Sequence, residues 1–181
     1  AVNQFLLFLY EQNQLERYYK LAVPKDTQVV SSKSTLLDLT VLWQESQVPN
    51  GRLIALLILE TGLLPSELLV IKRKDIQLEF QIMSVEKAGQ RRIVQLSSAI
   101  VDELRKYPSE TYLFEKKGEP YSRQWAFRQL EAFLHEKGQA SLSAQSLREQ
   151  YILRQLKANR SLHDIARDLG LKGITTLEKY R

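Results

Sequence analysis

The most constraining feature of the sequence is a continuous apolar run in the first third of the chain. It extends from Leu53 to Leu59 and reads Leu-Ile-Ala-Leu-Leu-Ile-Leu. A helix that is apolar on nearly every side must be covered by other elements, so residues 52–61 are expected to form the central helix of the core. Asn50 is predicted to cap this helix and Gly62 to end it. The run is too short to cross a bilayer, so no membrane partner is expected.

Helical periodicity recurs on both sides of this run, and it changes to alternation in the middle of the chain. Further helices are predicted at residues 3–21, 35–46, 65–72, 98–107, 122–137, 144–158, 161–169 and 175–180. Residues 22–34 lack a helical period and are predicted to be a linker. Apolar residues alternate over 76–85 and again over 93–96, with the turn candidate Lys87-Ala-Gly-Gln between them, which indicates an antiparallel sheet ending in a hairpin. The predicted fold class is mainly α with a small antiparallel β-sheet (α+β).

Charge and composition narrow the classes of function. The net charge is +5, and residues 101–181 carry 15 Lys and Arg against 11 Asp and Glu. This excess is compatible with a polyanionic partner. The absence of cysteine excludes disulfides and thiolate metal sites and is typical of a cytoplasmic protein. His135 and His163 lack metal-ligand partners at useful spacing, so no metal site is predicted. The chain begins Ala-Val-Asn and its one methionine is Met83, so we expect it to be part of a longer protein.

Four segments, in chain order, are candidates for a functional site. They are Thr61-Gly-Leu-Leu-Pro-Ser-Glu-Leu68, Val85-Glu-Lys-Ala-Gly-Gln-Arg-Arg-Ile-Val94, Leu142-Ser-Ala-Gln-Ser-Leu-Arg148 and Leu169-Gly-Leu-Lys-Gly-Ile-Thr-Thr-Leu-Glu-Lys-Tyr180. Taken singly, each has an ordinary structural interpretation: a helix end and start, a solvated hairpin lysine, a surface arginine and a packing tyrosine. Their common order along one chain is the informative feature.

Together the four segments resemble the catalytic domain of the tyrosine recombinase (phage integrase) family, most closely its bacterial Xer type. The first is similar to Thr-Gly-Leu-Arg-x-Ser-Glu-Leu, with Leu64 at the arginine position. The third is similar to His-x-x-Arg, with Gln145 at the histidine and Arg148 at the arginine. In the fourth, the family has Leu-Gly-His followed nine residues later by a tyrosine; here Leu171 and Tyr180 hold those two positions.

The resemblance assigns three catalytic roles. Tyr180 would be the nucleophile that attacks a scissile phosphodiester and forms a 3′-phosphotyrosyl link. Arg148 would bind the phosphate through its planar guanidinium. Lys87, in the hairpin sequence Lys-x-Gly-x-x-Arg, would be the general acid that protonates the leaving 5′ oxygen. No metal or other cofactor is implied, because the ester energy is kept in the covalent intermediate.

The resemblance also implies the partner and the domain organisation. Duplex DNA would be the partner, bound by a clamp of two domains. Four protomers would assemble on the DNA, either as a homo-tetramer or as a hetero-tetramer with a second recombinase. Arg91, Arg92 and Lys172 are the candidate DNA-binding cations. Residues 1–22 would be the last helix of an N-terminal core-binding domain that binds DNA, residues 23–34 the linker and residues 35–181 the catalytic domain.

Three of the six catalytic positions of the family depart from its pattern in this chain: Leu64, Gln145 and Leu171. Each missing group would stabilise charge on the phosphate or move a proton, and the loss of one such donor typically costs about 100- to 1000-fold in rate. The first hypothesis is therefore a recombinase whose cleavage is weak or depends on a partner. The alternative is a DNA-binding architectural or regulatory protein that keeps the fold without strand exchange. A third reading is an unrelated helical protein, which the ordered segments disfavour.

Overall fold

The computed structural model describes residues 8–12, 14–15, 35–87 and 89–180. By its internal contacts the chain divides into two units, residues 1–31 and 32–181. In the first unit, residues 8–11 are helical, and the Gln12 amide donates to the Phe8 carbonyl at 3.0 Å. Most of the helix predicted at 3–21, and the linker predicted at 22–34, lie outside the described residues. The second unit contains the four segments singled out above.

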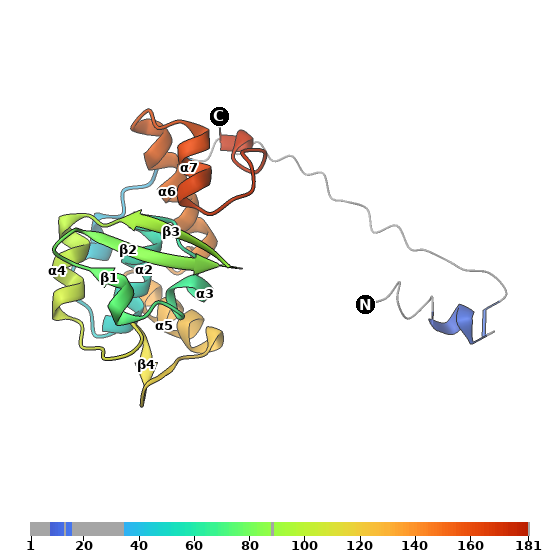
Figure 1. Cartoon of the computed structure of the whole chain (residues 1–181), viewed down its shortest axis with the longest axis horizontal. Helices are drawn as coiled ribbons and strands as arrows, with labels where there is room; N and C mark the ends of the chain where they lie inside the picture. Colours follow the sequence, from blue (N-terminus) through green and yellow to red (C-terminus); the bar gives the residue numbers. More distant parts are fainter. Residues whose placement is uncertain (1–7, 13, 16–34, 88, 181) are drawn as a thin grey trace. The chain divides into compact units, whose positions relative to one another are not determined.

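Helix α2 (Pro49–Thr61) is the centre of the second unit, as its apolar run predicts (Figure 1). Residues 53–59 are all between 0% and 4% exposed. The helix ends at Gly62, whose left-handed backbone (φ 68°) suits a residue without a Cβ. Its start corrects the prediction that Asn50 is the cap. Val48 occupies the N-cap position because Pro49, which has no N–H and a fixed φ, is favoured in the first turn.

Helices surround α2 on several sides. These are α3 (Pro65–Leu68), α4 (Ser98–Lys106), α5 (Arg123–Glu136) and α6 (Ala144–Lys157), and α7 (Leu162–Asp168) packs on α6. The bounds of α4 to α7 agree with the predicted helices to within one residue. A serine caps each of these four helices by accepting a backbone N–H with its hydroxyl: Ser97, Ser122, Ser143 and Ser161.

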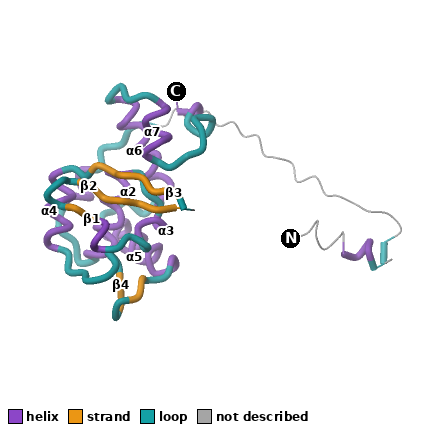
Figure 2. The backbone as a smooth tube through the Cα atoms, in the orientation of Figure 1, coloured by secondary structure: helices purple, strands orange, loops and turns teal. Residues whose placement is uncertain are grey.

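Strands β1 (Ile76–Gln77), β2 (Ile82–Lys87) and β3 (Gln90–Gln95) form an antiparallel sheet in that order (Figure 2). Lys87 pairs with Gln90 at the end of the β2–β3 hairpin, which confirms the predicted hairpin. The alternation predicted through residue 82 stops early. Phe80 is 71% exposed and Gln81 has a positive φ of 53°, so residues 78–81 turn the chain between β1 and β2.

Three predicted helices are shorter in the structure, and in two of them tertiary hydrogen bonds use the backbone differently. Residues 35–46 contain only the 3₁₀ turn η1 (Thr40–Trp43), since the buried Gln150 side chain accepts from the Leu37 amide and donates to the Thr35 carbonyl. The helix predicted at 65–72 ends at residue 68. The backbone of residues 71–73 hydrogen-bonds with residues 111–113 instead.

The third shortened helix is at the end of the chain, and one hairpin was not predicted. Residues 175–180 contain only the 3₁₀ turn η3 (Glu178–Tyr180). The unpredicted hairpin pairs β4 (Glu115–Lys116) with β5 (Glu119–Pro120) around Gly118, whose φ is 81°. Two-residue strands carry too little alternation to be recognised in a sequence.

The buried apolar residues form two clusters. The larger one surrounds α2 and includes the inner face of the sheet. The smaller, which we call the C-terminal cluster, is formed by the buried residues Tyr151, Ile152, Ile165, Ala166, Leu169 and Leu177. Tyr180 packs against the C-terminal cluster, so the helices that follow Arg148 are a platform for the last tyrosine. Within the described part of the chain, none of the helices has the length and apolarity required to cross a membrane.

Candidate active site

Glu67 joins the hairpin to the segment that follows α2. It lies in α3 and is only 3% exposed. One of its oxygens, Oε2, accepts from the Leu64 amide at 2.8 Å, and the other, Oε1, lies 2.8 Å from the Arg92 guanidinium and 3.7 Å from Lys87 Nζ. A buried carboxylate is stabilised by such paired charges. Glu67 therefore pairs with Arg92 and lies within ion-pair distance of Lys87, the predicted general acid.

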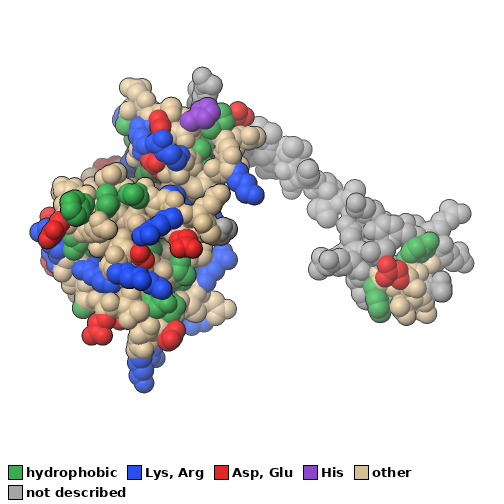
Figure 3. Space-filling view, in the orientation of Figure 1, with side chains coloured by type: hydrophobic (Ala, Val, Ile, Leu, Met, Phe, Trp, Pro, Cys, Tyr) green, Lys and Arg blue, Asp and Glu red, His purple; other side chains and the backbone are tan. Residues whose placement is uncertain are grey.

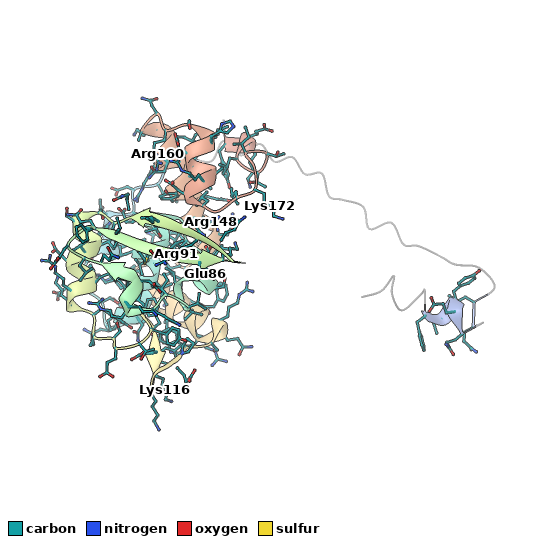
Figure 4. All side chains as sticks on the ribbon, viewed as in Figure 1. Glu86, Arg91, Lys116, Arg148, Arg160 and Lys172 are labelled. Carbon is teal, nitrogen blue, oxygen red and sulfur yellow. The ribbon has the colours of Figure 1, made fainter. Side chains whose placement is uncertain are left out.

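Arg148 is the buried cation of the site. It lies in α6 with 8% exposure, and in Figure 4 it lies where the hairpin meets the C-terminal helices. Burial lowers the pKa of its guanidinium; the nearby charge of Glu67 opposes that shift and Arg92 adds to it. No described residue forms an ion pair or a hydrogen bond with this guanidinium. A buried charge without a partner is costly, and it is the group an incoming anion would neutralise.

Tyr180 is held at the edge of the same site. Its ring packs on the C-terminal cluster, and its hydroxyl donates to Glu149 Oε1 at 3.0 Å. Arg148 and Tyr180 are close enough to interact electrostatically. Burial raises the pKa of the Tyr180 hydroxyl, Lys179 acts in the opposite direction, and Glu149 raises it further. The structure thus connects the three residues, which are far apart in the sequence: Glu67 interacts with both Lys87 and Arg148, and Arg148 interacts with Tyr180.

The three positions that depart from the family pattern lie around this region. Leu64 precedes α3 and lines a pocket of about 250 Å³ together with Arg123 and Gln145. Gln145 is exposed and donates to Glu149 Oε1 at 3.2 Å. Leu171 packs against the C-terminal cluster. An apolar side chain at two of the three positions leaves fewer groups that could contact a phosphate.

A basic pocket of about 490 Å³ lies between the hairpin and residues 167–172. Its cationic lining is Lys87, Arg91, Arg92, Arg167 and Lys172. Arg91 is 64% exposed and Lys87 is 47% exposed, whereas Arg92 is 13% exposed. Arg92 donates from Nε to the Asp168 carbonyl at 3.0 Å in addition to its ion pair. The candidate DNA contacts therefore share one pocket, but Arg92 is already bonded on two sides. Figure 3 shows Lys and Arg side chains gathered over the face of the sheet.

Sequence reasoning assigned no site role to two carboxylates. These carboxylates are Glu67 and Glu149. Their positions in the sequence could have indicated a role in the site: Glu67 is part of the Ser-Glu-Leu ending of the first segment, and Glu149 directly follows Arg148. The described residues contain no cluster of His, Cys, Asp or Glu that could hold a metal ion, and both His135 and His163 are exposed.

Comparison with known proteins identifies the class. The family model described as "Phage integrase family" matches residues 36–181, which is more than half of the chain. The chain therefore belongs to the phage integrase family. Its second unit carries the fold and the ordered segments of that family's catalytic domain.

Relatives within the family are close. A "Tyrosine recombinase XerD-like" protein of Streptococcus gordonii is 77% identical over all 181 residues, which span 75% of that protein. The protein of the same description from Streptococcus sanguinis is 59% identical over the same residues, or 74% of its length.

Solved structures have the same fold at lower identity. XerA recombinase is 20% identical, with a TM-score of 0.68 over 98% of this chain and 68% of that one. XerH site-specific recombinase, in a pre-cleavage complex with its difH substrate, is also 20% identical, with a TM-score of 0.69 over 99% of this chain and 59% of that one. At 20% identity, the structural similarity shows the fold of the chain and nothing beyond it.

Proposed function

We propose that this chain is the catalytic part of a site-specific DNA recombinase that cuts and rejoins duplex DNA through a 3′-phosphotyrosyl intermediate. Its cleavage is weak or depends on a partner subunit, as the three departures from the family pattern imply. The observation that carries the proposal is Arg148, a buried guanidinium without a partner among the described residues, in electrostatic reach of the Tyr180 hydroxyl. A planar guanidinium that can bind two phosphate oxygens, next to a hydroxyl nucleophile, suits a phosphate better than other anions.

In the proposed reaction each retained residue acts on a different atom. Arg148 binds the non-bridging oxygens of the scissile phosphate and stabilises the charge that develops on them. Tyr180 Oη attacks the phosphorus, and the P–O5′ bond breaks. Lys87, held beside Glu67 at 3.7 Å, protonates the leaving 5′ oxygen. The reverse sequence rejoins the strand, because the energy of the ester is retained in the phosphotyrosyl bond.

The DNA partner is part of the same proposal. XerH is described in a complex with its difH substrate, and the Tn1549 transposon integrase in a complex with transposon right end DNA. We assign Arg91 and Lys172 to phosphate contacts beside the site, and we assign Arg92 mainly to holding the hairpin on residues 168–170. We also assign residues 1–22 to the end of a core-binding domain, 23–34 to a linker and 35–181 to the catalytic domain. The proposed assembly on DNA is a tetramer, either of this protein alone or of this protein with a second recombinase.

Covalent trapping tests the proposed cleavage. The protein would be incubated with a pool of nicked DNA fragments from its source genome, denatured, and searched for protein–DNA adducts. The unsubstituted protein is expected to form adducts, and Tyr180→Phe is expected to form none. Sequencing the DNA in the adducts would define the target. Salt-sensitive DNA binding without any adduct, also when cell extract supplies the partner, would contradict the proposal.

DNA affinity is expected to fall steeply as salt rises, because bound phosphates release counterions. Arg91→Ala and Lys172→Ala should each weaken binding to all sequences alike and reduce the slope of log affinity against log salt by about 1. Lys116→Ala is the control, since this exposed lysine lies on the β4–β5 hairpin, away from Arg148 in Figure 4. Fluorescence anisotropy with labelled duplex measures the slopes. Equal slopes for all three variants would refute the assigned contacts.

Restoring the family pattern is expected to raise cleavage. Leu64→Arg, Gln145→His and Leu171→His together return one phosphate-binding guanidinium and two groups that donate or move protons. Each such group contributes about 100- to 1000-fold when it acts independently, and coupled groups contribute less than the product. Both adduct formation and DNA affinity would be measured in the triple variant. Adduct formation should increase, whereas DNA affinity should change little. A folded triple variant that forms no more adduct would refute the idea that these positions limit the rate.

A binding-only function is the second candidate, and one observation favours it. Leu171 packs against the C-terminal cluster, so an apolar side chain occupies the position at which the family pattern has a histidine. A protein that grips DNA without cutting it would keep Arg91 and Lys172 and would not depend on Tyr180. Tyr180→Phe separates the two candidates, because it should leave a binding-only function intact.

A further inference from the structure

We propose that Glu149 is the proton acceptor for Tyr180: its carboxylate takes the hydroxyl proton as the phenolic oxygen attacks the phosphate. This inference rests on the proposed function, since it concerns the same nucleophile. None of the sequence motifs assigned Glu149 a role.

Two hydrogen-bond donors and one cation converge on a single oxygen of Glu149. Oε1 accepts from Tyr180 Oη at 3.0 Å and from Gln145 Nε2 at 3.2 Å, and Lys179 Nζ lies 3.9 Å away. The Glu149 side chain is 30% exposed, so it is reachable from solvent but oriented by these contacts. Glu149 follows Arg148 directly in α6. The same helical turn therefore supplies the phosphate-binding cation and the carboxylate that receives the nucleophile's hydrogen bond.

The site needs such an acceptor. Burial raises the pKa of the Tyr180 hydroxyl, so at neutral pH the phenol is protonated and a weak nucleophile. Gln145, at the family's histidine position, can donate a hydrogen bond to Glu149 but cannot take up a proton. Among the described groups in contact with the Tyr180 hydroxyl, Glu149 is the base with direct hydrogen-bond geometry.

The proposed step balances without a co-reactant. The Oη–H bond of Tyr180 breaks and its proton moves to Glu149 Oε1, while the Oη–P bond forms. The P–O5′ bond breaks, and Lys87 gives a proton to the departing oxygen. As the new ester bond forms, the phenolic oxygen becomes more acidic, so a carboxylate becomes able to accept its proton.

The electrostatic surroundings are compatible with this transfer. The charged groups that face Tyr180 are Lys179 from its own turn and Glu149 and Arg148 from α6. Lys179 Nζ also lies 4.7 Å from the centre of the Tyr180 ring. The two cations offset the repulsion between the Glu149 carboxylate and an incoming phosphate.

An activated phosphodiester tests the proposal without a DNA target. Bis(4-nitrophenyl) phosphate releases 4-nitrophenolate, which needs no protonation, and attack by Tyr180 leaves an aryl phosphate on the tyrosine that mass spectrometry locates. With the 181-residue chain, Glu149→Gln is expected to slow adduct formation about 100-fold at pH 7 while keeping a hydrogen-bond acceptor. The deficit should shrink as pH rises, because hydroxide then removes the proton. Glu178→Gln, which removes the same charge from the turn of Tyr180, should react like the unsubstituted chain, and Tyr180→Phe should give no adduct.

A second measurement is independent of any reaction. In a ¹³C NMR titration of the tyrosine Cζ atoms, with the Tyr180 signal assigned by its loss in Tyr180→Phe, Glu149→Gln should lower the pKa of Tyr180 and Glu178→Gln should leave it nearly unchanged. The proposal is overturned by an equal or faster adduct rate in Glu149→Gln, by an unreactive Tyr180 in the unsubstituted chain, or by an unshifted pKa. A reactive Tyr180 that depends on Glu149 but never forms a DNA adduct would instead count against the recombinase function alone.

Discussion

Arg148→Met is expected to abolish most phosphotyrosyl formation without destabilising the protein. Methionine keeps much of the apolar volume of the arginine stem and removes the guanidinium. Loss of one group that stabilises the developing phosphate charge costs about 100- to 1000-fold in rate. The guanidinium is buried and without a partner among the described residues, so its removal should also raise the free energy of unfolding, by about 1–3 kcal/mol.

Arg148→Met is thus expected to lower the rate of phosphotyrosyl formation while raising the free energy of unfolding, and a general loss of folding would not produce this combination. Adduct trapping with nicked DNA measures the first effect, and urea denaturation measures the second. Arg154→Met is the matched control on the same helix, because Arg154 forms an ion pair with Glu60 at 2.9 Å and has no place in the proposed site. A large loss of stability in Arg148→Met, beyond that of Arg154→Met, would mean that Arg148 is a structural residue.

Gly62→Ala is expected to destabilise the protein by about 2–5 kcal/mol. Two costs add: an L-residue in the left-handed region costs roughly 1–2 kcal/mol, and overpacking typically costs about 1–3 kcal/mol. The second cost arises because a Cβ on Gly62 would lie 2.4 Å from Leu169 Cδ2 and 2.6 Å from Tyr151 Cδ1. Both residues belong to the C-terminal cluster that supports Tyr180, so cleavage should fall as well.

Gly138 provides the control for backbone strain alone. Its φ of 67° is nearly the same as the 68° of Gly62, but a Cβ on Gly138 would have no atom within 4 Å. Gly138→Ala should therefore cost only the conformational part, roughly 1–2 kcal/mol. Urea denaturation of both variants measures the difference. Equal losses of stability would show that the contact between Gly62 and the C-terminal cluster contributes nothing.

Elements whose stability is local were predictable from the sequence. The apolar run of α2 predicts a core helix whichever helices cover it, and the serine caps and apolar periodicity of α4 to α7 set their bounds to within one residue. The hairpin also follows from alternation on either side of a turn. In contrast, residues 35–46 have a helical pattern, but Gln150 hydrogen-bonds their backbone from more than one hundred residues away. No local pattern contains that contact.

The same division applies to the site. The resemblance of four ordered segments to the family predicted the roles of Lys87, Arg148 and Tyr180 and identified the departures at Leu64, Gln145 and Leu171. Only the tertiary structure decided how these residues are held, because burial and charge pairing depend on what the fold brings together. It made Glu67 the common partner of Lys87 and Arg92, left Arg148 without a partner among the described residues, and placed the Tyr180 hydroxyl on the Glu149 carboxylate.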